Sequence, residues 1–110
     1  MLSNLKLIKN YFLLFSKKDI YELRKIFHKN IVLKDWEGLY KGLSAVTKKN
    51  KGIFGNCKKI KIKIINTIQK NNIVCVQLKI FINSNPKAIE VVDLITFKNN
   101  KIKKIEAYKC

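Results

Sequence analysis

The chain has 110 residues, of which 47% are hydrophobic, so it can form one domain that buries about two thirds of its unfolded surface, and wholesale disorder is excluded. Its net charge is +17, and no apolar run approaches the roughly 20 residues of a membrane span. Three widely spaced cysteines and one histidine do not make a metal-ligand set. We therefore expect a single domain over residues 1–110 that does not associate with a membrane and binds no metal or cofactor.

The positive charge comes from 23 lysines and a single arginine, Arg24. The lysines are spread along the chain and alternate with isoleucine over residues 59–64. Because bidentate phosphate recognition favours arginine, we expect solvated lysine-rich faces and weak, salt-sensitive binding to polyanions. Specific nucleic-acid binding is not expected, although a specific polyanion partner remains an alternative. The first ten residues lack the apolar core and cleavage site of a secretory signal, so we expect a reducing cytoplasm.

The first third of the chain predicts two helices. Residues 3–16 have apolar side chains at helical spacing, which predicts a helix over this range. The stripe consists of Leu7, Ile8, Tyr11, Leu14 and Phe15. Asp19, with Glu22 three residues later, is typical of a capped helix start, and this second helix is expected to end near residues 28–30.

A short strand and a short third helix are predicted next. Residues 31–35 alternate, which places Asp35 on the apolar face of the strand with Ile31 and Leu33. Gly38 and Gly42 then indicate a turn. Apolar residues at positions 43, 46 and 54 favour a short helix that ends near residues 55–56.

The remainder predicts four long strands. They cover residues 58–69, 73–83, 87–97 and 101–108 and are separated by Asn-rich hairpin signals. Asp93 interrupts the apolar run of the third of these strands. Helices followed by a strand meander predict an α+β fold, in which a curved antiparallel (mixed) sheet wraps around three N-terminal helices.

Tyr11, Asp35 and Asp93 each place a titratable group where the pattern calls for an apolar one. Burial of such groups is costly unless they are hydrogen-bonded or neutral. We therefore take these three residues as the candidate site. Each also has a structural alternative: Tyr11 as a tyrosine at the rim of the core, Asp35 as a turn cap beside Gly38, and Asp93 as a buried, hydrogen-bonded acid.

The order of these segments resembles the nuclear transport factor 2-like superfamily, in its SnoaL-like and ketosteroid-isomerase-like branch. The resemblance runs over nearly the whole chain and is carried by residues 10–19, 30–38, 42–46, 91–97 and 101–108. It implies a cone-shaped fold with an internal hydrophobic pocket. In the isomerases an aspartate base ends the first strand, while a tyrosine and a neutral aspartic acid bind the oxyanion.

Carried onto this sequence, the resemblance implies that Asp35 is the base and that Tyr11 and Asp93 are the donors. We expect Trp36, Tyr40 and Phe54 to line the pocket. The chain is then an isomerase, cyclase or dehydratase that acts by acid–base chemistry on a small apolar carbonyl compound. The alternative is a non-catalytic ligand-binding module, or a homodimerisation module that pairs through its sheet around residues 73–81.

Overall fold

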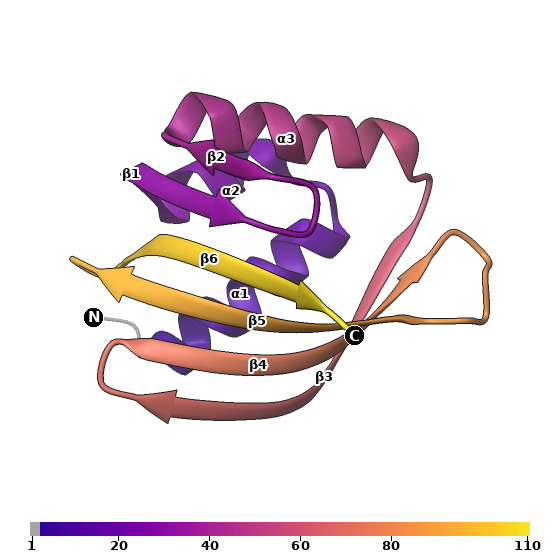
Figure 1. Cartoon of the computed structure of the whole chain (residues 1–110). Helices are drawn as coiled ribbons and strands as arrows, with labels where there is room; N and C mark the ends of the chain where they lie inside the picture. The colour runs from indigo at the N-terminus through magenta and orange to yellow at the C-terminus, as the bar shows by residue number, and fades with distance from the viewer. Residues whose placement is uncertain (1–2) are drawn as a thin grey trace.

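The computed structural model describes residues 3–110, which form three helices and a six-stranded sheet. Figure 1 shows α3 crossing above the β1–β2 edge of the sheet and α1 behind its middle. In chain order the elements are α1 (Asn4–Ser16), α2 (Ile20–Ile26), β1 (Phe27–Lys34), β2 (Leu39–Lys41), α3 (Leu43–Asn56), β3 (Ile60–Lys70), β4 (Ile73–Ile82), β5 (Ile89–Lys98) and β6 (Lys101–Lys109). The predicted α+β class is confirmed.

The sheet has the strand order β2-β1-β6-β5-β4-β3. All neighbours are antiparallel except β1 and β6, which run parallel, so the sheet is mixed. The chain reaches this arrangement by three hairpins, β3–β4, β4–β5 and β5–β6, after which β6 returns to lie beside β1. The predicted Asn-rich turn between β5 and β6 is confirmed, since Asn99 and Asn100 both have positive φ, a conformation that asparagine tolerates.

Both N-terminal helices begin at side-chain caps. The Ser3 hydroxyl accepts a hydrogen bond from Lys6 N at 3.2 Å, and Asp19 Oδ1 accepts one from Glu22 N at 3.1 Å. The predicted start of the second helix is therefore confirmed. Its predicted end near residues 28–30 is wrong, because Phe27 already belongs to β1, where it is buried and pairs with Ile102 of β6. Pairing with a distant strand overrides the local helical pattern at this point.

The segment after β1 contains more regular structure than the sequence predicts. A three-residue strand, β2, lies where only a turn was expected, and it pairs antiparallel with β1. The third helix, predicted from residues 43, 46 and 54 with an end near residues 55–56, runs over Leu43–Asn56 and has 14 residues. It follows Gly42, whose φ of 92° is readily adopted only by glycine. The middle turns of α3 bring the polar residues Thr47 and Asn50 to the inside of the fold, where both are buried.

The core lies between the helices and the inward face of the sheet. On β5 the inward positions are Val91, Asp93, Ile95 and Phe97, all buried, while Val92 and Leu94 point outward. Buried and outward positions alternate along this strand, and the alternation places the carboxyl group of Asp93 inside the core. Helix α1 covers this region with buried Leu7, Ile8, Tyr11 and Phe12.

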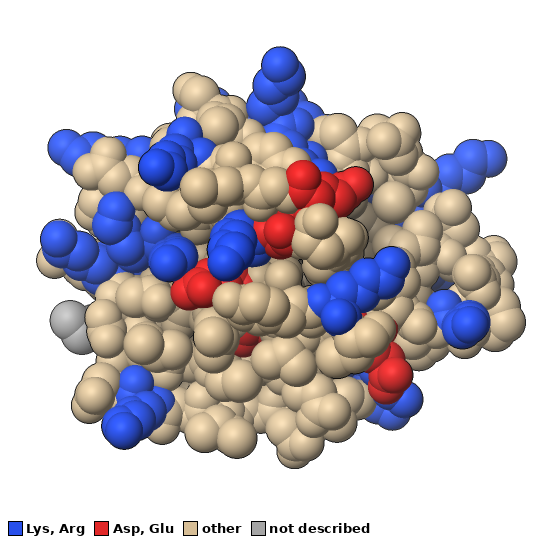
Figure 2. Space-filling view, in the orientation of Figure 1, with Lys and Arg blue, Asp and Glu red and all other residues tan. Residues whose placement is uncertain are grey.

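Basic side chains are distributed over the surface. Figure 2 shows lysine and arginine over most of one face rather than in one patch, with acidic side chains near its centre. Within residues 3–110, no helix is both long and apolar enough to cross a membrane.

Candidate active site in the cavity between helices and sheet

A cavity of about 260 Å³ lies between the helices and the inward face of the sheet. Most of its lining side chains are apolar and come from α1, α3 and strands β1 and β3–β6. Trp36, half exposed, and Glu37, also exposed, are among the lining residues, so the cavity opens at the β1–β2 turn. The polar side chains on its wall are Tyr11, Asp35, Glu37, Asn50 and Asp93.

All three residues of the candidate site line this one cavity. Tyr11 comes from α1, Asp93 from the middle of β5, and Asp35 from the first residue after β1. Three separate segments of the chain thus bring one phenol and two carboxyl groups to the same hollow, which is the arrangement that the catalytic hypothesis requires.

Asp93 is almost fully enclosed, with 6% of its surface exposed. Its Oδ1 atom is buried and has no hydrogen-bond partner among the described residues. Burial raises the pKa of this carboxyl group from 3.8 to about 7, because the ion loses its hydration. Oδ1 therefore lacks the hydrogen bond that the structural alternative for Asp93 assumes. Near neutral pH, Asp93 is present in both its neutral and its ionised form.

Tyr11 is packed among aromatic rings on the helix side of the cavity. Its ring centroid lies 4.9 Å from that of Phe12 and 6.0 Å from those of Phe15 and Phe27. Burial raises the pKa of Tyr11 well above its ordinary value, and the charge of Asp93 raises it further. The phenol therefore keeps its proton at physiological pH and can act as a hydrogen-bond donor.

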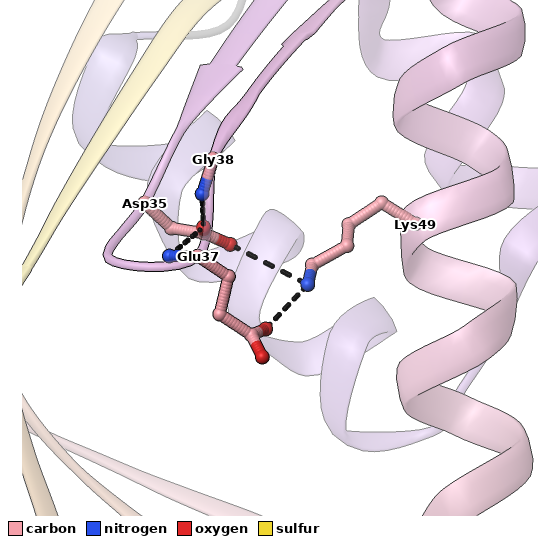
Figure 3. Close-up of polar contacts among 4 residues, drawn as sticks. All are labelled: Asp35, Glu37, Gly38 and Lys49. Carbon is pink, nitrogen blue, oxygen red and sulfur yellow. Dashed lines mark hydrogen bonds and ion pairs between the residues drawn. The ribbon is translucent and has the colours of Figure 1, made fainter.

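Asp35 has a structural role and a position on the cavity wall at the same time. Its Oδ1 accepts hydrogen bonds from Glu37 N at 2.8 Å and from Gly38 N at 3.0 Å, which shapes the β1–β2 turn. Its Oδ2 lies 3.9 Å from the Lys49 ammonium group. Figure 3 shows Lys49 reaching from α3 to both Asp35 and Glu37. The turn-capping interpretation is correct, and among residues 3–110 the contact of Oδ2 is the ion pair with Lys49.

Lys49 and Asn50 are functional candidates that the sequence analysis missed. Lys49 is one of 23 lysines, and nothing in its local pattern distinguishes it from the others. Asn50 is different, because it lies four residues after Val46 on the buried stripe of α3 and could have been noticed as a polar residue at an apolar position. The structure buries its side chain in the cavity wall.

Of the three residues expected to line the pocket, Trp36 does so, whereas Tyr40 and Phe54 do not. Trp36 lines the cavity at its mouth. Tyr40 lies outside the cavity wall and lines a shallow pocket beside α3, where the Lys49 ammonium group is 5.1 Å from its ring centroid. Phe54 lies behind the wall and packs against Phe15, with ring centroids 4.9 Å apart. The position of α3 over the sheet determines that Tyr40 and Phe54 lie outside the cavity wall.

The arrangement suits proton transfer. One carboxylate is held by two backbone N–H groups and a lysine, whereas the other lies in an apolar wall with a raised pKa. Two acids in such different environments can divide the roles of base and acid. Within residues 3–110, no three His, Cys, Asp or Glu side chains converge as a metal site would require.

Comparison with known proteins identifies the family and the fold of the chain. The sequence model of a family described as the SnoaL-like domain matches residues 8–105. A nuclear transport factor 2-like protein of unknown function from Cytophaga hutchinsonii superposes with a TM-score of 0.84 at 15% identity, covering 100% of this chain and 92% of that one. A candidate polyketide cyclase from Sinorhizobium meliloti gives 0.83 at 16% identity, covering 93% of each chain.

A candidate ketosteroid isomerase from Kribbella flavida gives a TM-score of 0.82 at 8% identity, covering 96% of this chain and 76% of that one. At these identities the structural likeness shows the fold. No curated protein matches the chain by sequence.

Proposed function

The chain belongs to the SnoaL-like domain family, and from that premise we propose that its cavity binds a small, mostly apolar carbonyl compound and catalyses an isomerisation, cyclisation or dehydration. The reaction is acid–base chemistry by side chains of this chain. A candidate polyketide cyclase and a candidate ketosteroid isomerase share the fold, which supports the reaction class.

The observation that carries the proposal is the convergence of Tyr11, Asp35 and Asp93 on one apolar cavity. Asp35 is proposed as the base that removes a proton from the carbon next to the carbonyl group. The electron pair moves to the carbonyl oxygen, and donors placed in advance stabilise the resulting charge. Tyr11 and the neutral form of Asp93 are the proposed donors. Asp35 then returns the proton to another atom of the same compound.

The size of the cavity limits the ligand. A volume of about 260 Å³ lies just below the roughly 300–1,000 Å³ of pockets that take drug-sized ligands. A compound with one or two rings is therefore expected, with its apolar body against Leu78, Ile80 and Val91 of the sheet.

Hydrogen exchange tests this proposal without knowledge of the natural substrate. The probe is 1-tetralone, a two-ring ketone, dissolved in D₂O with the protein, and NMR follows the loss of the hydrogens next to its carbonyl group. We expect the wild-type protein to accelerate the exchange and the double variant Asp35→Asn, Asp93→Leu not to do so. Equal rates for the two proteins would refute the proposed chemistry.

The second candidate function is a module that dimerises through its sheet. It is supported by exposed apolar side chains at Ile68 and Ile73, on the outer face of β3 and β4, and at Tyr108, on the outer face of β6. Such a face can pair with that of a second copy, as isologous dimers do.

A further inference from the structure

Two buried polar atoms on the cavity wall have no hydrogen-bond partner among the described residues. They are Asp93 Oδ1 on β5 and Asn50 Nδ2 on α3. Asn50 has only 3% of its surface exposed. Buried polar groups are nearly always paired, so two unpaired groups on the wall of one cavity call for an explanation.

The other acids on this wall already have partners. Asp35 accepts from two backbone N–H groups, and Glu37 pairs with Lys49. Asn50 and Asp93 come from different walls, α3 and β5, and do not bond to one another. A molecule inside the cavity that has two separate polar groups would satisfy both residues.

We propose that the ligand is a hydroxylated carbonyl compound, with its carbonyl oxygen at Tyr11 and Asp93 and its hydroxyl group at Asn50. A hydroxyl group both donates and accepts hydrogen bonds, so it suits either end of the Asn50 amide. Asn50 is then a specificity residue that selects compounds with this second oxygen. The inference rests on the proposed function, because it assumes that the cavity holds a carbonyl compound.

Thr47 provides a matched control on the same helix. It lies one turn before Asn50, is also buried, and its Oγ1 also lacks a partner among the described residues. Unlike Asn50, however, Thr47 is not part of the cavity wall. A general effect of buried polar groups on α3 would change ligand binding in variants of both residues. Direct recognition of the ligand would change binding only in variants of Asn50.

The test compares binding of 1-tetralone with that of 5-, 6- and 7-hydroxy-1-tetralone by isothermal titration calorimetry. In the wild-type protein we expect at least one hydroxylated probe to bind about tenfold more tightly than 1-tetralone, as one buried hydrogen bond allows. Asn50→Leu, which has a similar volume, is expected to lose this preference and to keep its affinity for 1-tetralone. Thr47→Val is expected to keep the preference.

Each other outcome overturns the inference. If all four probes bind the wild-type protein equally, or if Asn50→Leu keeps the preference, the hydroxyl site is wrong while the proposed function stands. A preference lost equally in Thr47→Val would also refute a specific role for Asn50. If none of the probes binds, the inference falls together with the proposed function.

Discussion

Inside the cavity, the charge of an ionised Asp93 adds to burial in raising the pKa of the Tyr11 phenol. Protonation of Asp93 removes that charge and leaves two neutral donors in the cavity, Tyr11 on the helix side and Asp93 on the sheet side. The protonation state of Asp93 therefore decides whether the cavity offers one of these hydrogen-bond donors or both.

The stability of the protein should depend on pH through Asp93. The ordinary pKa of an aspartic acid side chain is 3.8, and in the folded protein the pKa of Asp93 is about 7. Below pH 4 both the folded and the unfolded chain hold the proton. Between pH 4 and 7 only the folded chain holds it, so the unfolding free energy falls as the pH rises, by about 4 kcal/mol in total, and then levels off.

Chemical denaturation of wild type and Asp93→Leu at pH 4 and pH 8 measures this effect. The difference in unfolding free energy between the two proteins should change by about 4 kcal/mol in favour of the variant at pH 8. The comparison cancels the titration of the other groups. An unchanged difference would mean that folding does not raise the pKa of Asp93.

The exchange of 1-tetralone should slow as the pH rises through about 7, because the neutral form of Asp93 is then lost. Asp93→Asn retains an N–H donor at every pH and should lose this pH dependence. Asp93→Leu has no donor and should slow the reaction by about 10²-fold or more. A rate that rises with pH, together with an inactive Asp93→Asn variant, would instead identify Asp93 as the base.

Asp35→Asn separates the two roles of this residue. An asparagine side-chain oxygen can still accept from Glu37 N and Gly38 N, so the turn and the melting temperature should change little. The side chain is no longer basic, and the exchange rate should fall by about 10²–10⁴-fold. Glu37→Gln, at the same turn, serves as the control and should stay near the wild-type rate. A fully active Asp35→Asn variant would restrict Asp35 to turn capping.

Dimerisation through the sheet is tested at Ile68, which is 69% exposed on β3. We expect the wild-type protein to sediment as a dimer at micromolar concentration and Ile68→Lys to sediment as a monomer whose circular dichroism spectrum is that of the folded protein. Tyr21→Lys is the control, because Tyr21 is equally exposed but belongs to helix α2 and not to a strand of the sheet. A monomeric wild-type protein would show the dimer prediction to be wrong.

Local sequence patterns determined most of the fold and part of the site. Helical spacing places Tyr11 on the buried stripe of α1, and strand alternation places Asp93 on the inward row of β5. Both patterns depend only on neighbours in the chain, as do the Asn turns and the Asp19 cap, so they can be deduced without tertiary structure.

Only the tertiary structure decided what depends on distant partners. Phe27 joins β1 because it pairs with Ile102, and Asp35 meets Lys49 because α3 is long enough to cross the β1–β2 turn. The same placement of α3 puts Asn50 on the cavity wall and leaves Tyr40 and Phe54 outside it. The angle and height of a helix over a sheet result from the packing of many side chains, and no local period in the sequence encodes them.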